Sequence, residues 1–313
     1  MRKEFFQALL EMARDDERLF LVVGDVGYGF VEPFIREFPE RYLNVGVAEQ
    51  NMIGISSGLS LCGRVVFCYS ICNFPTLRCV EQIRNDLCYH DSDVKIVSTG
   101  GGLGYGALGF THHLTEDIAM MRALPNMTII APGDPIEAAF AARSACLTRG
   151  PFYIRLARGG DEVVHSSSVH LRIGKAVTVR EGDDITLIST GGLLRNAVHA
   201  ADLLKNDGIS VRVLSMHTVK PIDADSILLA ARETKAIVSL EEHGPIGGLS
   251  SAVAEVLAAA KERGFFLRVC VERPFLKEVG SHEYLQRVHG LTTEAIHARL
   301  GQFWSEAVTR HEQ

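Results

Sequence analysis

The residue range 43–61, with the sequence LNVGVAEQNMIGISSGLSL, constrains the fold more than any other part of the chain. Its first part alternates apolar with smaller or polar residues, as a half-buried strand does, at Leu43, Val45 and Val47. Its second part places apolar residues at helical intervals, at Met52, Ile53, Leu59 and Leu61. Glu49 therefore lies where a strand gives way to a helix.

A carboxylate at such a position is under two opposing influences. The free N–H groups and the positive end of the helix dipole favour its ionised form, whereas apolar neighbours favour the neutral form. A glutamate held in this way can share a proton with a basic ring nitrogen. The alternative interpretation of Glu49 is an ordinary first-turn glutamate, which helix starts prefer.

Length and charge set the class of protein. A chain of 313 residues suits two domains, and 47% hydrophobic with 22% charged residues describes a soluble globular protein. The net charge of −6 argues against nucleic-acid and anionic-membrane surfaces as partners. Gln7 and Glu11 interrupt the apolar residues near the start, so we expect neither a signal peptide nor a membrane span.

The cysteines indicate a reducing compartment. None forms a CxxC pair, and most lie in apolar surroundings, where free cysteine packs as a small hydrophobe. We expect reduced core thiols and a cytoplasmic protein, with the seven at Cys62, Cys68, Cys72, Cys79, Cys88, Cys146 and Cys270.

Strand and helix patterns alternate along the whole chain, which predicts an α/β protein with parallel, doubly wound sheets. The serine-containing stretch VVHSSSVHLR within residues 162–172 breaks this pattern and indicates a linker. We predict one α/β domain over residues 1–165 and a second, smaller one over residues 166–313.

A glycine-rich stretch, STGGGLGYGALGF, ends at residue 110. It contains neither GxxxxGK[ST] nor a clean G-x-G-x-x-G, so we interpret it as a flexible loop over a site rather than a dinucleotide motif. His112 and His113 follow it. Two successive histidines cannot point to the same side of a strand, and no third ligand stands at a usual zinc spacing. One of them faces the site as an acid, a base or a polar clamp, or both are structural.

These motifs together resemble those of thiamine-diphosphate enzymes of the transketolase type, specifically their C-terminal portion. The resemblance spans nearly the whole chain. Its motifs, in chain order, are GD at 24–25, VAEQNM at 47–52, YS at 69–70, EQIRND at 81–86, TH at 111–112, LPNM at 124–127, APGD at 131–134, GP at 150–151 and Arg158.

The resemblance implies roles around the cofactor. Glu49 is the carboxylate that bonds the pyrimidine ring nitrogen, which stabilises the imino tautomer that removes the thiazolium C2 proton. Phe74 is the candidate for the aromatic residue that stacks on the pyrimidine, and Tyr69 and Arg78 line the same cavity. Asp25 matches an aspartate near the cofactor at the subunit interface. The alternatives are core packing for Phe74 and a loop cap for Asp25.

The resemblance also implies substrate contacts. His112 matches the histidine that contacts the substrate carbonyl or the first hydroxyl, and His113 stands where relatives often carry glutamine. Arg2 and Arg158 match phosphate-binding arginines, since an arginine fork suits phosphate or carboxylate, although either fits a surface position as well.

Three positions depart from the transketolase pattern. Leu108 replaces an aspartate that reads a sugar hydroxyl, Gly100 replaces a phosphate-binding histidine, and Gly29 replaces a serine that helps to hold phosphate. The substrate is therefore expected to be deoxygenated, unphosphorylated or anchored by another group, and the sequence does not name the donor, the acceptor or the pathway.

The GDG…N motif that binds Mg²⁺ and the diphosphate in the family is missing, and only Gly182-Asp183-Asp184 comes near it. The resemblance therefore implies one subunit of a split enzyme. We expect an N-terminal-type partner that carries the Mg²⁺ ligands, two copies of each chain (α2β2), and sugar or sugar-phosphate substrates. In the second domain, we interpret His217 and His243 as structural or at a dimer interface.

The hypothesis is a subunit that, with its partner, transfers a two-carbon ketol unit from a ketose to an aldehyde. Two alternatives stay open. One is the β subunit of a 2-oxo acid dehydrogenase, which shares the layout and Glu49, although Asn51-Met52 and His112 favour transketolase. The other is a non-catalytic scaffold.

Overall fold

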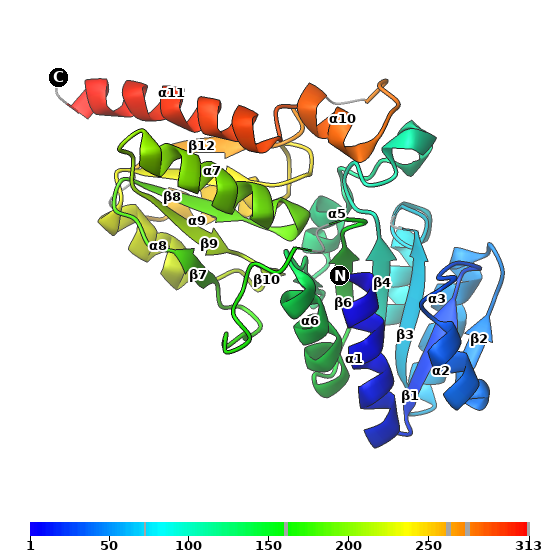
Figure 1. The fold of residues 1–313 in the computed structure, drawn as a ribbon. Coiled ribbons are helices and arrows are strands. Elements are labelled where there is room, and N and C mark those ends of the chain that lie inside the picture. Colours follow the sequence, from blue (N-terminus) through cyan, green and yellow to red (C-terminus); the bar gives the residue numbers. More distant parts are fainter. Residues whose placement is uncertain (72, 160–161, 261–263, 273–275, 312–313) are drawn as a thin grey trace.

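The computed structural model describes residues 1–71, 73–159, 162–260, 264–272 and 276–311, with side chains up to 307. Two α/β units lie side by side, each built on its own sheet (Figure 1). Almost all neighbouring strands within each sheet run parallel. The predicted fold class is therefore present in both halves of the chain.

The first sheet has the strand order β10-β5-β6-β4-β3-β1-β2, and β10 is its one antiparallel member. Helices α1 and α6 pack together over one face (Figure 1). The strands are β1 (Leu19–Val23), β2 (Tyr42–Asn44), β3 (Val65–Ile71), β4 (Val94–Thr99), β5 (Thr128–Ile130), β6 (Phe152–Leu156) and β10 (Thr218–Lys220). The helices are α1 (Arg2–Asp15), α2 (Glu32–Glu37), α3 (Glu49–Leu61), α4 (Val80–Gln82), α5 (Asp117–Ala123) and α6 (Pro135–Leu147).

The second sheet has the order β12-β11-β8-β9-β7, with β7 antiparallel at its edge. Helices α7 and α11 pack against each other, as do α8 and α9. The strands are β7 (Val177–Arg180), β8 (Ile185–Ser189), β9 (Val211–Ser215), β11 (Ala236–Leu240) and β12 (Phe265–Val269). The helices are α7 (Leu194–Asn206), α8 (Ala224–Glu233), α9 (Leu249–Ala258), α10 (His282–Val288) and α11 (Thr293–His311).

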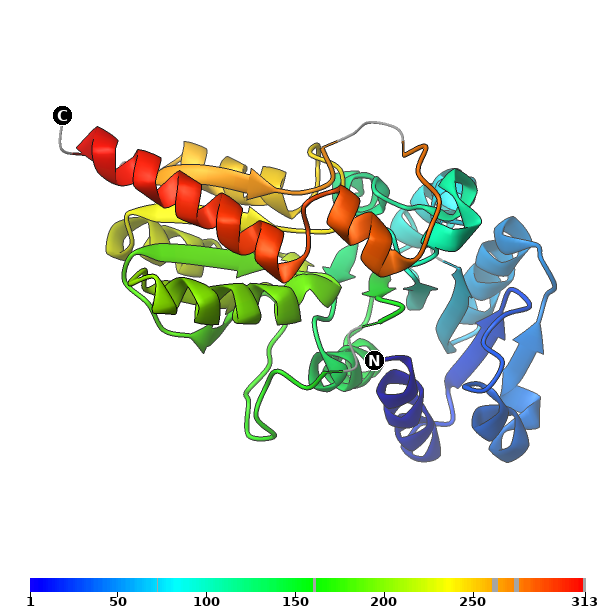
Figure 2. The same cartoon turned by 45° about the horizontal axis from the view of Figure 1, so that its top comes forward.

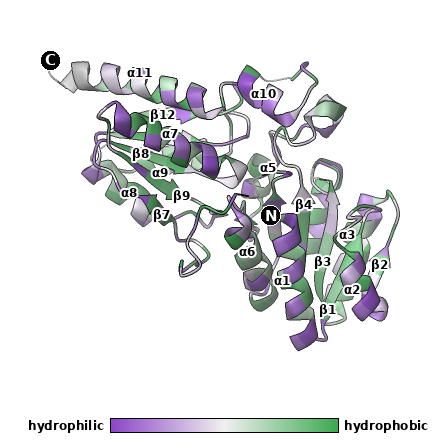
Figure 3. Ribbon diagram, in the orientation of Figure 1, coloured by the Kyte–Doolittle hydropathy of each residue, from purple (hydrophilic) through white to green (hydrophobic). Residues whose placement is uncertain are grey.

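Local sequence explains these elements. Every residue of β6, β8 and β11 is buried, as expected for strands covered by helices on both faces, and apolar residues are concentrated on the strands (Figure 3). Helix α6 begins because the side chain of Asp134 accepts a hydrogen bond from the amide of Glu137 at 2.8 Å. Asp223 and Ser281 cap α8 and α10 in the same way.

The predicted switch at Glu49 is confirmed, because α3 begins at this residue. The strand before it is shorter than expected. It ends at Asn44, at the edge of the sheet, and Val47 is 71% exposed rather than half-buried. Residues 77–88 form a 3-10 turn, α4 and a π-helical turn at Ile83–Cys88.

The division at residues 165/166 stays a prediction, since β10 from the second half of the chain joins the first sheet. Along the described part of the chain, no helix combines the length and the apolar character needed to cross a membrane. The six described cysteines are free and all are buried except Cys62, which is exposed, contrary to the expectation of core thiols throughout. Cys72 lies outside the described residues.

Candidate active site

A buried carboxylate lies beside the ends of β1 and β3. Glu49, the first residue of α3, is 1% exposed. Its Oε2 accepts a hydrogen bond from Nη1 of Arg78 at 2.7 Å, and its Oε1 accepts one from the hydroxyl of Ser70 at 3.2 Å. Because a carboxylate removed from water is costly unless it is paired, these two donors make the burial of Glu49 possible.

The two strands leave space for this group. The amide of Gly24, just after β1, donates to the carbonyl of Tyr69 on β3 at 3.1 Å. A Cβ atom on Gly24 would lie 3.1 Å from the hydroxyl of Ser70 and 3.6 Å from Oε1 of Glu49. The carboxyl ends of parallel strands are the usual place for ligand sites in α/β sheets, and here a glycine keeps that place open.

An aromatic ring and a histidine ring lie next to the ion pair of Glu49 and Arg78. The guanidinium carbon of Arg78 lies 4.9 Å from the ring centroid of Phe74. The rings of Phe74 and His112 are 5.3 Å apart at an interplanar angle of 78°. The side-chain amide of Asn73 donates to the carbonyl of Thr111, which joins the two segments. The structure thus brings together four predicted site residues from three separate parts of the sequence.

The structure places Tyr69 elsewhere. Side chains alternate along a strand, so Tyr69 faces away from the side on which Ser70 meets Glu49. Its ring packs edge-on against Phe6 at 5.0 Å and is 1% exposed. Burial raises the pKa of the Tyr69 hydroxyl to about 12. Tyr69 is therefore buried on the other side of β3 from Glu49, and its hydroxyl interacts with Arg2 and Tyr105.

Asp25 lies at an exposed turn after β1, with a left-handed φ of 55°. Its Oδ1 accepts hydrogen bonds from the amide of Asn44 at 2.9 Å and from the hydroxyl of Tyr28 at 3.0 Å. These two bonds lower the pKa of Asp25. Tyr28 itself is 74% exposed, so the turn is presented on the surface of this chain.

The two candidate phosphate-binding arginines lie against different aromatic rings. The guanidinium carbon of Arg158 is 4.6 Å from the ring centroid of Tyr105, whose ring is in turn 6.3 Å from that of His112. The guanidinium carbon of Arg2 is 4.7 Å from the ring of Phe30. Arg158 therefore joins the neighbourhood of His112. Arg2 also interacts with the hydroxyl of Tyr69, which in turn interacts with Tyr105.

His113 turns inward. It is 4% exposed, and burial lowers the pKa of its ring. His112 is only half-buried, so the two neighbours point in different directions, as expected. The inward position of His113 argues against the predicted direct contact with a substrate.

The three departures from the family pattern have different surroundings. A Cβ atom on Gly100, which has φ +84°, would lie 2.2 Å from the ring of Tyr105, so this ring fills the space of a side chain at position 100. Leu108 is 54% exposed, and a Cβ atom on Gly29 would meet nothing within 4 Å. Both Leu108 and Gly29 border open space.

The sequence motifs assign no role to Ser70, Asn73 or Tyr105, although Ser70 belongs to the YS motif at 69–70. Ser70 holds Glu49, Asn73 holds Thr111, and Tyr105 stands between Arg158 and His112. The available signal was the position of Ser70 and Asn73 near the end of a buried strand next to β1, where side chains of a site converge. Tyr105 carried no such signal, because its role depends on how the glycine-rich segment folds.

Asp134, Glu137 and His165 have their ligand atoms within 4.8 Å of one another, an arrangement that resembles a metal site. The oxygens already have donors, however. Asp134 accepts from the amides of Glu137, Val164 and His165, and Glu137 accepts from Gly133 N, His165 Nε2 and Ser215. The group is therefore a hydrogen-bonded junction between the two units rather than a place for a cation.

The two histidines of the second domain are also fully buried. His217 lies 3.8 Å from Glu137 and its Nε2 is 3.2 Å from the carbonyl of Arg172. His243 lies 3.9 Å from Asp117. Both stand among residues from the two halves of this chain, in agreement with a structural role.

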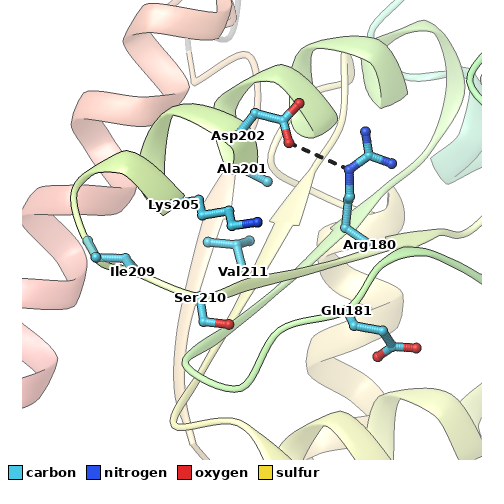
Figure 4. A pocket seen from close by; sticks show the side chains of 9 residues that line it. Arg180, Glu181, Ala201, Asp202, Lys205, Ile209, Ser210 and Val211 are labelled. Atoms are coloured by element: carbon cyan, nitrogen blue, oxygen red, sulfur yellow. Dashed lines mark ion pairs between the residues drawn. The ribbon is translucent and has the colours of Figure 1, made fainter.

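A separate depression of about 400 Å³ lies on the second unit, between α7, β7 and β9 (Figure 4). Arg180 and Lys205 lie at it, and Arg180 is 3.5 Å from Asp202. None of the predicted site residues lines this depression. This depression is therefore separate from the residues around Glu49.

Comparison with known proteins adds the family. The domain family described as "Transketolase, pyrimidine binding domain" matches residues 1–160, and the family described as "Transketolase, C-terminal domain" matches residues 174–296. The chain belongs to the transketolase family. The expected resemblance and the order of its two domains are confirmed.

Relatives of this transketolase-family chain include separate subunits. The "Putative transketolase C-terminal section" of Methanocaldococcus jannaschii is 38% identical over 96% of this chain and 95% of its own length. One of the subunits of an apulose-4-phosphate transketolase, from Phocaeicola vulgatus, is 38% identical over 82% of this chain and 83% of its own. A solved structure titled "Split gene transketolase, inactive beta4 tetramer" superposes with a TM-score of 0.87 at 34% identity, covering 98% of this chain and 97% of that one. The chain is thus a transketolase-family subunit of the split type.

Proposed function

We propose that this subunit, together with an N-terminal-type partner, transfers a two-carbon ketol unit from a ketose or ketose-phosphate donor to an aldehyde or aldose acceptor. The observation that carries the proposal is the buried Glu49, held by Ser70 on one oxygen and by the half-exposed Arg78 on the other. The side chain of Arg78 is 44% exposed, whereas that of Glu49 is 1% exposed. The family membership gives this carboxylate its expected partner, thiamine diphosphate.

The residues around Glu49 fit that cofactor. A ring-nitrogen donor can replace Arg78 at Oε2, which leaves the carboxylate paired throughout. Phe74, on the same side, offers an aromatic surface for the pyrimidine. Thiamine diphosphate, when bound, supplies the carbon nucleophile that attacks the donor carbonyl. Glu49 holds the proton shared with the pyrimidine ring nitrogen, in a site where low water access strengthens the bond.

On the substrate side, we assign the carbonyl or first hydroxyl of the sugar to His112, and its ring contact with Phe74 supports this assignment. Arg158, close to Tyr105, and Arg2, which interacts with Tyr69, are the candidates for an anionic group of the substrate. Asp25 and Tyr28, which are exposed at a turn after β1, suit a contact with another subunit.

The partner must complete the site. The sequence contains no GDG followed by asparagine, and Gly182-Asp183-Asp184 lead into β8 of the second unit, away from Glu49. The diphosphate and Mg²⁺ are therefore assigned to the partner chain, in an α2β2 assembly. The inactivity of the related split-gene chain as a β4 tetramer supports the need for a second type of chain.

The test is a calorimetric titration of thiamine diphosphate with Mg²⁺ into this chain alone and into its mixture with the chain encoded beside its gene. Binding is expected in the mixture only. The mixture is then assayed for ketol transfer with xylulose 5-phosphate, fructose 6-phosphate, apulose 4-phosphate and unphosphorylated fructose as donors. Tight binding to this chain alone would contradict the split site, and acyl transfer from a 2-oxo acid to lipoate without ketol transfer would replace the proposed reaction.

A further inference from the structure

The glycine-rich segment before His112 is anchored rather than flexible, contrary to the expectation from its composition. Residues 100–104 are all buried. The amide of Gly102 donates to the carbonyl of Leu114 at 2.8 Å, and the amide of Leu114 donates back at 2.9 Å. This pair closes the base of a loop, and Tyr105 and His112 lie within it.

A carboxylate from the second unit holds the base of this loop. Glu242, just after β11, is 8% exposed. Its Oε1 accepts a hydrogen bond from the amide of Leu103 at 2.7 Å. Its Oε2 lies 2.8 Å from Nε2 of His282 and 2.9 Å from the amide nitrogen of Gln286, both on α10. One buried side chain thus joins the loop to α10, and Figures 1 and 2 show α10 beside this part of the first unit.

The glycines allow this close approach. Gly102 has φ +70°, and a Cβ atom on it would lie 2.6 Å from Oε1 and 2.7 Å from the backbone oxygen of Glu242. A Cβ atom on Gly106 would lie 2.2 Å from Cδ1 of Leu285 on α10. Any side chain at these positions would push the loop away from the second unit.

A second anchor acts on the other side of the loop base. Nη2 of Arg155 donates to the carbonyl of Leu114 at 3.1 Å and to the carbonyl of Glu242 at 3.0 Å. Nε of Arg155 is held by Asp117 at 2.6 Å. Both ends of the loop, Leu103 and Leu114, are therefore fixed to the same residue of the second unit, directly or through one guanidinium.

We infer that Glu242 is a positioning residue, supplied by the C-terminal domain, that fixes the loop 102–114 and thereby the location of His112. The anchoring is a property of this chain by itself, while its effect on turnover rests on the function proposed above. The C-terminal domain then contributes to the site without touching the substrate.

The experiment is hydrogen–deuterium exchange of the reconstituted complex, with Glu242→Ala compared with wild type. Loss of the carboxylate frees the amide of Leu103 and the two side chains of α10. We expect the exchange rates of the backbone amides of residues 103–113 to rise at least about tenfold. Local opening of the loop would then no longer require these hydrogen bonds to break. The matched control is Glu241→Ala, since Glu241 is also buried but accepts from the amides of Leu249 and Ser250 at the start of α9.

The control is expected to increase exchange at the start of α9 and to leave residues 103–113 unchanged. Two further variants are included, and the milder of them, Glu242→Gln, guards against a protein that fails to fold. Glu242→Gln keeps an acceptor for Leu103 and is expected to restore most of the protection, and Gly102→Ala is expected to disturb the same segment from the other side. Unchanged exchange of 103–113 in Glu242→Ala and in Gly102→Ala would overturn the inference.

Kinetics separate this inference from the proposed function. With the same four sugar donors, Glu242→Ala is expected to lower kcat/KM about 10- to 100-fold, as misplacement of a contact group does, with thiamine diphosphate affinity unchanged. A wild-type complex without ketol transfer would defeat the proposed function, and the exchange result would still decide the anchoring.

Discussion

Arg78 and Glu49 form an ion pair of 2.7 Å in which one partner is buried and the other is half-exposed. The carboxylate is fixed by α3 and by Ser70, while the guanidinium lies over Phe74 at the open side. A buried carboxylate that loses its partner is strongly destabilised, so a replacement donor must enter as Arg78 leaves. In this chain the pair therefore keeps the buried carboxylate neutralised at the proposed cofactor site.

Replacement of Glu49 by glutamine is expected to reduce ketol transfer about 10²- to 10⁴-fold, because the amide cannot take up the shared proton. The fold should persist, since Ser70 can still donate to the amide oxygen. Turnover of the reconstituted complex and thermal unfolding of the chain measure the two effects. Glu40→Gln, at an exposed position, is the control, and full activity in Glu49→Gln would refute the assigned role.

Replacement of Arg78 by methionine is expected to lower the free energy of unfolding of the isolated chain by about 1–2 kcal/mol, less than for a fully buried pair because Arg78 is half-exposed. The double variant with Glu49→Gln should recover at least half of this loss, because no charge is then left unpaired. Urea unfolding of the four proteins gives the coupling. Strictly additive effects would show that the pair does not matter for stability.

Substitutions of Phe74 and Tyr69, the two aromatic residues predicted at the cofactor, should affect cofactor binding differently. Phe74→Ala is expected to weaken binding of thiamine diphosphate to the complex about three- to tenfold, through loss of an aromatic contact. Tyr69→Phe keeps the ring in its place beside Phe6 and should leave the affinity within about twofold. Calorimetry with Mg²⁺ present measures both. Equal losses in the two variants would mean that Tyr69 reaches the cofactor after all.

The junction between the units should make stability depend on pH. Burial opposes a charge on His165, but the hydrogen bond to Glu137 at 2.7 Å and its negative charge outweigh burial and raise the pKa of His165. Burial also opposes a charge on Glu137, and His165 and His217 nevertheless lower the pKa of Glu137. Asp134 and Ser215 face the same pair.

A raised histidine pKa stabilises the fold below its ordinary value of 6.5, and this is lost as pH rises through the raised pKa. A lowered glutamate pKa stabilises above its ordinary value of 4.5, and this is lost as pH falls through the lowered pKa. Both contributions are fully present between pH 4.5 and pH 6.5. His165→Asn should therefore lower the free energy of unfolding most in this pH range, and less as pH rises through the raised pKa of His165. Urea unfolding at several pH values, with exposed His170→Asn as the control, measures it, and a pH-independent loss would contradict the assignment.

Metal ions should not stabilise the isolated chain. The oxygens of Asp134 and Glu137 already accept hydrogen bonds, so a cation would have to displace buried donors. We expect Mg²⁺, Zn²⁺ or a chelator to change Tm by less than about 1 °C, whereas Mg²⁺ should be required for cofactor binding by the complex. A large, saturable rise of Tm with Mg²⁺ or Zn²⁺ would reveal a metal site in this chain.

The sequence by itself determined the features that depend on local pattern. Mostly apolar runs predicted the buried strands, because a strand covered by helices on both faces favours apolar side chains on both of its sides. The change of period at Glu49 predicted the start of α3, and the resemblance of the motifs predicted Glu49, Phe74, Arg78 and His112, which the structure brings together.

Only the tertiary structure decided which way side chains turn and what packs against a loop. Tyr69 and Ser70 are neighbours in sequence, yet strand alternation places one in the core and the other against Glu49. The glycines of residues 100–106 suggest flexibility from composition, but Gly102 and Gly106 allow Glu242 and Leu285 of α10, more than 130 residues later in the chain, to approach the backbone closely. Such contacts depend on distance in space, and local periodicity carries no information about them.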